Sequence, residues 1–309
     1  MPNIGIESLR GDIKIHLDDT ANKEYWDMVA PSASAKKKVA SLIKSKVDHS
    51  FTLDRLYIFI RGGRILKKSK KSSPKPSKNS RKFQKALIPL SYLRAIEESM
   101  NVGYAHLEDN IEFYVSGTKS KIIPCLDGVP KLPIDFDQEL VLALSSVMWH
   151  NQAQNETFGF RASNQKQIEY LYHNFSNHFG EIPLGKGSAE NHNLYIAPKV
   201  ATDIGLSYLD EHFDELDDYY HVAIVLGACA ARGKPIPKRI GGEGIAISSL
   251  AETPMYRVQS SLDKLGIAYE NKTDMVIVSK ESTYSLSSLC DGFTELYPKS
   301  EQLLSGLNF

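Results

Sequence analysis

The stretch YYHVAIVLGACAARGK at residues 219–234 decides the fold, because an earlier stretch, LVLALSSVMWHNQ at residues 140–152, has the same character. Both are helical in pattern and unusually rich in small residues. Such residues let two helix backbones approach closely. The sequence therefore predicts that these two helices pack against each other. The small residues concerned are Ala143, Ser145, Ser146, Gly227, Ala228, Ala230 and Ala231.

The segments that follow the two helices also match. Each helix is followed by an alternating strand, an amphipathic helix and a hairpin, and each amphipathic helix stops at a glycine suited to a left-handed cap, Gly180 or Gly266. In the second strand, Ile245 and Ile247 alternate with small or polar residues, so one sheet face should be buried and the other polar. The first strand places Arg161 on its polar side. Internal repetition of this kind predicts a tandem pair of α+β units.

Length and composition set broad limits. A chain of 309 residues suits two or three domains. No apolar run approaches the roughly 18–20 residues of a membrane span. The three cysteines, Cys125, Cys229 and Cys290, have no metal-site spacing and no disulfide pattern. We therefore expect a soluble, intracellular protein with reduced cysteines.

The formal net charge of zero conceals a strong asymmetry. Residues 61–85 hold 11 of the 37 Lys and Arg and no Asp or Glu, so the rest of the chain has a net charge of −11. Residues 67–82 are rich in Lys, Ser and Pro and lack the large apolar residues that folding requires. This composition predicts a mobile basic arm at 61–85. An acidic stretch at 203–218 is a candidate surface for a protein partner.

The N-terminal part is expected to be an α/β extension. Its pattern predicts helices at 36–47 and 88–101, the second with Ser91 as N-cap, and strands at 55–63 and 110–117. Three prolines and a glycine at 124–135 indicate a domain boundary.

The repeated pattern resembles the LAGLIDADG homing endonuclease family in its single-chain, two-repeat form, over residues 134–285. The resemblance implies a pseudo-twofold tandem repeat of αββαββα units, here at 131–216 and 217–309, behind an extension at 1–130. It implies that the two motif helices form the interface and that the polar sheet faces form a saddle over the DNA major groove. It also implies an acidic residue near the end of each motif helix, holding a divalent metal.

Neither repeat keeps that acidic residue, because the matching positions are His150 and Arg232. Magnesium-assisted cleavage needs hard oxygen ligands, whereas arginine repels a metal and can bind phosphate. The expectation is therefore a protein without catalytic residues, metal or cofactor. One alternative is an active magnesium-dependent endonuclease that uses Glu243 as a relocated acid.

Other chemistry-bearing residues have simpler interpretations. His173 and His178 are five apart on one helix, do not share a face and are expected at the surface. Trp26 and Trp149 are expected in the core or at an interface. Asp135, Asp137 and Glu139 precede or begin the first motif helix, where acids favour the helix dipole.

The resulting hypothesis is a non-catalytic nucleic-acid-binding protein, with duplex DNA favoured over structured RNA, and a monomer because two repeats supply the pseudo-dimer. The alternatives are the endonuclease, a protein-interaction or assembly module, and an RNA-binding component of a splicing or ribonucleoprotein assembly. Gln152, Gln154 and Asn155 are candidates for base-edge contacts. The candidate phosphate contacts are Arg61, Arg64, Lys67, Lys68, Lys70, Lys71, Arg81, Lys82, Arg161, Lys166, Lys186, Arg232, Lys234, Lys238, Arg239 and Lys272.

Overall fold

The computed structural model has two compact units, which are considered separately below. The N-terminal unit is Ile4–Pro133, and the C-terminal unit is Met1–Asn3 with Ile134–Phe309. Among the described residues, no helix is both long and apolar enough to cross a membrane. The residues described are 2–65, 83–115, 123–124, 132–148, 158–162, 165–180, 187–189, 192–197, 199–236, 244–248, 252–272 and 274–289.

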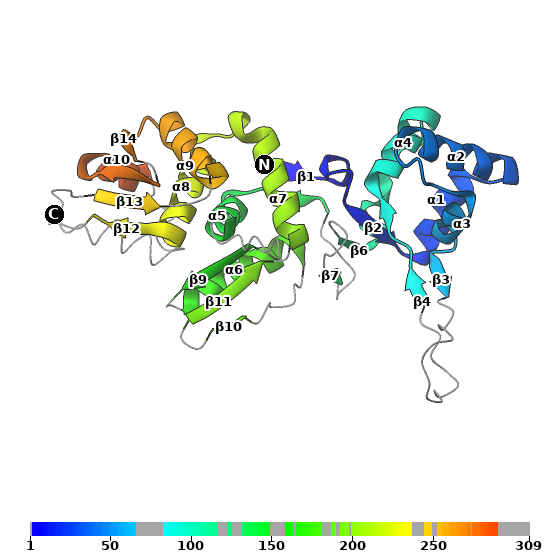
Figure 1. Cartoon of the computed structure of the whole chain (residues 1–309), viewed down its shortest axis with the longest axis horizontal. Helices are drawn as coiled ribbons and strands as arrows, with labels where there is room; N and C mark the ends of the chain where they lie inside the picture. The colour runs from blue at the N-terminus through cyan, green and yellow to red at the C-terminus, as the bar shows by residue number, and fades with distance from the viewer. Residues whose placement is uncertain are drawn as a thin grey trace. The chain divides into compact units, whose positions relative to one another are not determined.

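The N-terminal unit combines four helices with two antiparallel sheets over its described residues. One sheet has the order β5-β2-β6-β7, and β3 pairs with β4 in a separate hairpin. Figure 1 shows β3 and β4 side by side below the helices. The elements are η1 (Ile6–Ser8), β2 (Lys14–Leu17), α1 (Asp19–Val29), α2 (Ala33–Lys46), α3 (Leu53–Ile60), β3 (Gly63–Ile65), β4 (Phe83–Lys85), β5 (Ile88–Pro89), α4 (Leu90–Met100), η2 (Ala105–Asn110), β6 (Ile111–Val115) and β7 (Ile123–Pro124), and the short strand β1 (Asn3–Ile4) spans the division between the units.

The strand expected at 55–63 is wrong, because most of that segment is helix α3. The Thr52 hydroxyl accepts from the backbone N–H of Arg55 at 3.3 Å and caps the helix. Leu56 and Phe59, three residues apart, are buried on one face. Phe59 packs against Trp26 at a ring-centroid distance of 6.5 Å. Tertiary packing of a helical face therefore prevails over the strand propensity of this apolar run.

The helix expected at 88–101 is present as α4, but its predicted cap is wrong. Ser91 lies inside the first turn, and the N-cap residue is Pro89, which makes no side-chain capping hydrogen bond. Instead, the backbone N–H groups of Leu90 and Ser91 donate to the carbonyls of Ile13 and Gly11. A neighbouring chain segment thus satisfies the donors that a side-chain cap would otherwise take. Trp26 is buried, as expected.

The C-terminal unit has the same order of elements twice over its described residues: a buried helix, a strand, a covering helix, a hairpin and a third helix. The first series is β8 (Ile134–Asp135), α5 (Gln138–Val147), β9 (Phe158–Ala162), α6 (Gln165–Phe179), β10 (Gly187–Ala189), β11 (His192–Ala197), α7 (Lys199–His212) and η4 (Phe213–Glu215). The second is α8 (Asp218–Arg232), β12 (Gly233–Pro235), β13 (Gly244–Ser248), α9 (Glu252–Lys264), β14 (Tyr269–Lys272), β15 (Met275–Ser279) and α10 (Lys280–Leu289).

The sheet orders match in part, because β12 of the second sheet has no counterpart among the described strands of the first. The first sheet runs β9-β11-β10, and the second runs β12-β13-β15-β14, so each strand that precedes a covering helix pairs with the later strand of the following hairpin. Gly180 and Gly266 have φ of 86° and 66°, the left-handed conformation expected at the helix ends. The class is α+β, as the sequence predicts. A pseudo-twofold axis relating the two series stays a prediction.

Candidate functional site

The seam between α5 and α8 is the centre of the C-terminal unit. The Ser145 hydroxyl donates to the carbonyl of Ile224 at 2.6 Å, so a side chain of one helix reaches the backbone of the other. A Cβ built on Gly227 would lie 2.6 Å from Ser145 Cβ and 2.7 Å from the Leu142 carbonyl oxygen. This close approach confirms the packing predicted from the small residues.

The second sheet turns one face toward the helices and leaves the other partly exposed. Ile245, Ile247, Val276 and Val278 are fully buried, which confirms the predicted alternation. Cross-strand register places Lys234, Ala246, Ile277 and Glu270 in one row of the opposite face, with Ser248, Met275 and Lys272 in the next. The centre of these rows is mostly apolar, with Ser248 as its polar residue, so the face is less polar than predicted; its charged residues, Lys234, Glu270 and Lys272, are on the two edge strands.

The two lysines of that face are not equivalent. Lys272 pairs with Glu270 at 3.5 Å. No ion pair joins Lys234 to the residues that the structure describes, and its side chain is exposed. Lys234 is therefore the stronger of the two candidates for phosphate contact on this sheet.

Arg232, which the sequence resemblance predicts at a catalytic-acid position, is the last residue of α8 and is half-buried. Its counterpart His150 and the alternative acid Glu243 lie outside the described residues. No group of three or more His, Cys, Asp and Glu within the described ranges could hold a metal ion. The last residue of α8 thus carries a guanidinium and not a carboxylate.

The other predicted contacts are scattered over the described elements. Arg61 follows α3 and is exposed, Arg64 is in β3, and Arg161 is in β9 with its Cα opposite that of Leu194. Lys166 is in the first turn of α6. Outside the described residues lie Lys67, Lys68, Lys70, Lys71, Arg81, Lys82, Gln152, Gln154, Asn155, Lys186, Lys238 and Arg239, as well as Trp149.

His178 is buried, so the expected surface position is wrong for this residue, whereas His173 is exposed. The His178 ring lies between two acceptors: Nδ1 donates to the Asn174 carbonyl at 2.7 Å, and Nε2 is 3.0 Å from Asp137 Oδ2. Asp137 also accepts from the backbone N–H of Leu140 and caps α5. An imidazolium flanked by two oxygens links the covering helix to the start of the seam helix.

The ionisation of this pair follows from its surroundings. Burial alone would lower the pKa of His178, but the hydrogen bonds to Asp137 and Asn174 outweigh it and raise that pKa above 6.5. Burial likewise opposes ionisation of Asp137, yet the hydrogen bonds from His178 and Leu140 lower its pKa below 3.8. Both groups are therefore charged between pH 3.8 and pH 6.5.

We expect His178→Gln to destabilise the C-terminal unit by about 2 kcal/mol at pH 6, between the values for exposed and fully buried ion pairs. The raised histidine pKa gives stabilisation that is complete below pH 6.5 and is lost as pH rises through the folded value. The lowered aspartate pKa gives stabilisation that is lost as pH falls below 3.8. Urea unfolding from pH 4 to pH 9 should show that the difference in unfolding free energy between the wild type and the variant shrinks at high pH. A difference independent of pH would contradict the ion pair.

An arginine between the two halves of the C-terminal unit was not predicted from the sequence. Arg257 of α9 is 6% exposed and pairs with Asp210 of α7 through two hydrogen bonds of 2.8 and 2.7 Å. Its third nitrogen contacts Met148 S at 3.0 Å. Lys264 pairs with Asp214 at 3.2 Å. Part of the acidic stretch 203–218 is thus neutralised within the unit.

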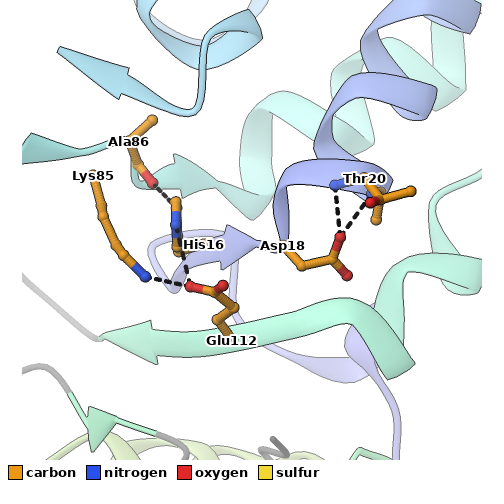
Figure 2. Close-up of polar contacts among 7 residues, drawn as sticks. His16, Asp18, Thr20, Lys85, Ala86 and Glu112 are labelled. Carbon is orange, nitrogen blue, oxygen red and sulfur yellow. Dashed lines mark hydrogen bonds and ion pairs between the residues drawn. The ribbon is translucent and has the colours of Figure 1, made fainter.

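His16, Lys85 and Glu112 form a polar cluster in the N-terminal unit that was not predicted from the sequence (Figure 2). His16 Nδ1 donates to the Ala86 carbonyl at 2.8 Å, Nε2 is 3.4 Å from Glu112, and Lys85 pairs with Glu112. Burial, assisted by Lys85, lowers the pKa of His16. The contacts join the residue after β4 to β2 and β6, so the cluster is structural.

The described part of the C-terminal unit has a close seam between two helices, with a strand, a covering helix and a hairpin after each. No family model matches the sequence, and no curated protein matches it.

Solved structures with a similar arrangement include two complexes of the homing endonuclease I-DmoI. A variant in complex with its target DNA and manganese is 10% identical, with a TM-score of 0.39 over 55% of this chain and 98% of that one. The complex with DNA and calcium is 10% identical, with a TM-score of 0.38 over 54% and 97%. The N-terminal LAGLIDADG domain of DUF199/WhiA is 14% identical, with a TM-score of 0.35 over 52% and 86%.

Proposed function

We propose that this protein binds nucleic acid without cutting it, and that its preferred partner is duplex DNA. The observation that carries the proposal is the concentration of positive charge. Residues 61–85 hold 11 Lys and Arg and no acid, in a chain whose remainder is strongly negative. The described ends of that run, Gly63–Ile65 and Phe83–Lys85, are paired strands, so the basic sequence between them starts and ends at one place on the N-terminal unit. A polyanion is the partner such a loop would attract.

The absence of cleavage is proposed from the end of the seam helix. Arg232 stands where a metal-dependent nuclease would need a carboxylate, and a guanidinium there favours phosphate over Mg²⁺. In the proposed mode, the sheets of the C-terminal unit contact the groove, with Lys234 as a phosphate contact. Gln152, Gln154 and Asn155 then supply base-edge contacts.

The preference for duplex DNA over structured RNA rests on the resemblance of the repeats to the homing endonucleases. A monomeric state is proposed because one chain carries both repeats. A protein partner at 203–218 is a weaker proposal, since Asp210 and Asp214 already pair with Arg257 and Lys264.

A mobility-shift titration with random-sequence duplex DNA and a structured RNA, at 50 to 200 mM salt, tests the proposal. Contacts to six to ten phosphates would lower the affinity for duplex about 10³- to 10⁵-fold across this range. RNA should bind less tightly than the duplex at each salt concentration. Binding of neither polymer at micromolar protein would overturn the proposal and favour the protein-interaction module.

The same reactions with Mg²⁺ or Mn²⁺ separate binding from cleavage. The duplex should remain intact, including with a library of cloned genomic sites as substrate. Cleavage that is lost in Glu243→Gln would favour the endonuclease with a relocated acid. Tighter binding of RNA would favour the splicing or ribonucleoprotein alternative.

A further inference from the structure

Tyr57 of α3 lies beside two cations that come from different parts of the N-terminal unit. Lys36 Nζ, from α2, is 5.6 Å from the centroid of the Tyr57 ring, and Arg61 Cζ, at the end of α3, is 5.8 Å from it. All three side chains are at least partly exposed. We call Lys36, Tyr57 and Arg61 the Tyr57 cluster. It holds two positive charges at one aromatic ring.

The cluster differs from other cations of the same unit in having no acidic partner. Lys46 pairs with Glu98, Arg55 with Asp48 and Lys85 with Glu112. By contrast, no ion pair within 4.0 Å joins Lys36 or Arg61 to the described part of the chain. Asp19 Oδ1 lies 3.5 Å from a Cβ built on Gly62, the residue after Arg61.

The placement of these charges does not serve helix stability alone. Arg61 at the C-cap of α3 suits the negative end of that helix dipole. Lys36, however, is the fourth residue of α2, near the positive end, and the first turn of α2 contains no acid. A cation there is unfavourable for the helix. Contact with the Tyr57 ring offsets part of this cost.

The cluster also lies where the basic run begins. Arg61 is its first residue, Gly62 and Gly63 follow with φ of 67° and 156°, and β3 starts at Gly63. The backbone N–H of Ala86, just after β4, donates to the Gly62 carbonyl at 2.8 Å and closes the base of the hairpin. A polyanion bound along residues 61–85 would therefore pass close to Tyr57.

We infer that the Tyr57 cluster is a binding site for the phosphodiester backbone of nucleic acid, at the base of the β3–β4 hairpin. The inference rests on the proposed function and adds a defined contact outside the C-terminal unit. Lys36 and Arg61 donate hydrogen bonds to phosphate oxygens, the guanidinium through two N–H groups. Tyr57 is a positioning residue, because its ring keeps the two cations together before the ligand arrives.

The test is the salt dependence of binding in the full chain carrying both Lys36→Gln and Arg61→Gln. Each phosphate contact contributes about 0.9 to the slope of log affinity against log salt for duplex DNA. The double variant should therefore have a slope smaller by about 2 and bind the duplex roughly 10- to 100-fold less tightly at 50 mM salt. Structured RNA of equal length, tested in parallel, shows which nucleic acid supplies the phosphates.

The matched control is Lys23→Gln with Lys44→Gln, which removes two exposed lysines and the same charge elsewhere in the N-terminal unit. The control should keep the wild-type slope. An unchanged slope in the cluster variant, or an equal decrease in the control, overturns the inference while leaving nucleic-acid binding in place. A wild-type chain that binds neither polymer overturns the proposed function, and the cluster's role with it.

Variants of Tyr57 test the positioning role. Tyr57→Phe keeps the ring and should bind like the wild type, whereas Tyr57→Leu should bind about two- to fivefold less tightly. Equal melting temperatures of the two variants would show that the loss is not one of folding. If Phe and Leu weaken binding equally, the ring does not position the cations.

Discussion

Gly227→Val is expected to lower the free energy of unfolding of the C-terminal unit by about 3 kcal/mol or more. The first added carbon would already lie 2.6 Å from Ser145 Cβ and 2.7 Å from the Leu142 carbonyl oxygen. Because the second of these is a backbone atom on α5, no rotamer change relieves the clash. The two seam helices must separate, and the fully buried side chains around them must repack.

The size of this effect can be bracketed with a smaller substitution. Gly227→Ala introduces the same first carbon but gains about 1 kcal/mol in helix propensity. Its net cost should therefore be about 1 to 2 kcal/mol, and that of Val clearly larger. For a unit of this length, 3 kcal/mol corresponds to a drop in melting temperature of about 6 to 12 °C. Thermal unfolding followed by circular dichroism measures it.

Ala231→Val is the control, on the same helix at a partly exposed position. The sequence grouped Ala231 with the small residues of the seam, but the structure leaves it partly exposed, so a β-branched side chain there should cost no more than about 0.5 kcal/mol. If Gly227→Val and Ala231→Val have equal effects, the seam is not as tight as its distances indicate.

The seam and the sheets were predictable because their sequence signals are local and strong. Small residues in two long apolar helices predict close packing, and the alternation of Ile245 and Ile247 predicts a sheet with one buried face. The glycines at 180 and 266 predict the helix ends because few other residues adopt positive φ. Each of these signals depends on residues near one another in the chain.

The wrong predictions concern positions whose structure is set by contacts with residues distant in the sequence. The run around Leu56 and Phe59 fits a strand or a helix over so few residues, and packing against Trp26 selects the helix. His178 looks like a surface residue until Asp137, 41 residues away, is brought beside it. No periodicity in the sequence indicates such a pair.

The Tyr57 cluster illustrates the same limit for function. Arg61 was a candidate contact on the basis of local charge, but Lys36 lies 25 residues earlier on another helix. Tyr57, whose ring both cations approach, belongs to no sequence motif. Only the packing of α2 against α3 identifies these three residues as one site.

Replacing the eight Lys and Arg of residues 67–82 with Gln should cause the largest loss of nucleic-acid binding. If all eight contact phosphate, the slope of log affinity against log salt for duplex DNA should fall by about 7. Affinity at 50 mM salt should fall about 10³-fold or more. The segment lies between the described strands β3 and β4, and its composition cannot support a core of its own. Folding should therefore be unaffected, which circular dichroism checks.

Two control variants separate charge from sequence. One control replaces every lysine of residues 67–82 with arginine, and the other scrambles the order of residues 67–82. Both keep the charge, so both should retain the wild-type slope of log affinity against log salt. Phosphate contacts depend on charge and carry no base information, so either control should leave sequence preference unchanged too. If the scrambled variant binds as poorly as the variant with eight Gln residues, the order of the side chains matters. Residues 67–82 would then contact more than the phosphate backbone. If the variant with eight Gln residues binds like the wild type, the positive charge at residues 67–82 is not the source of affinity, and the proposal loses the observation that carries it.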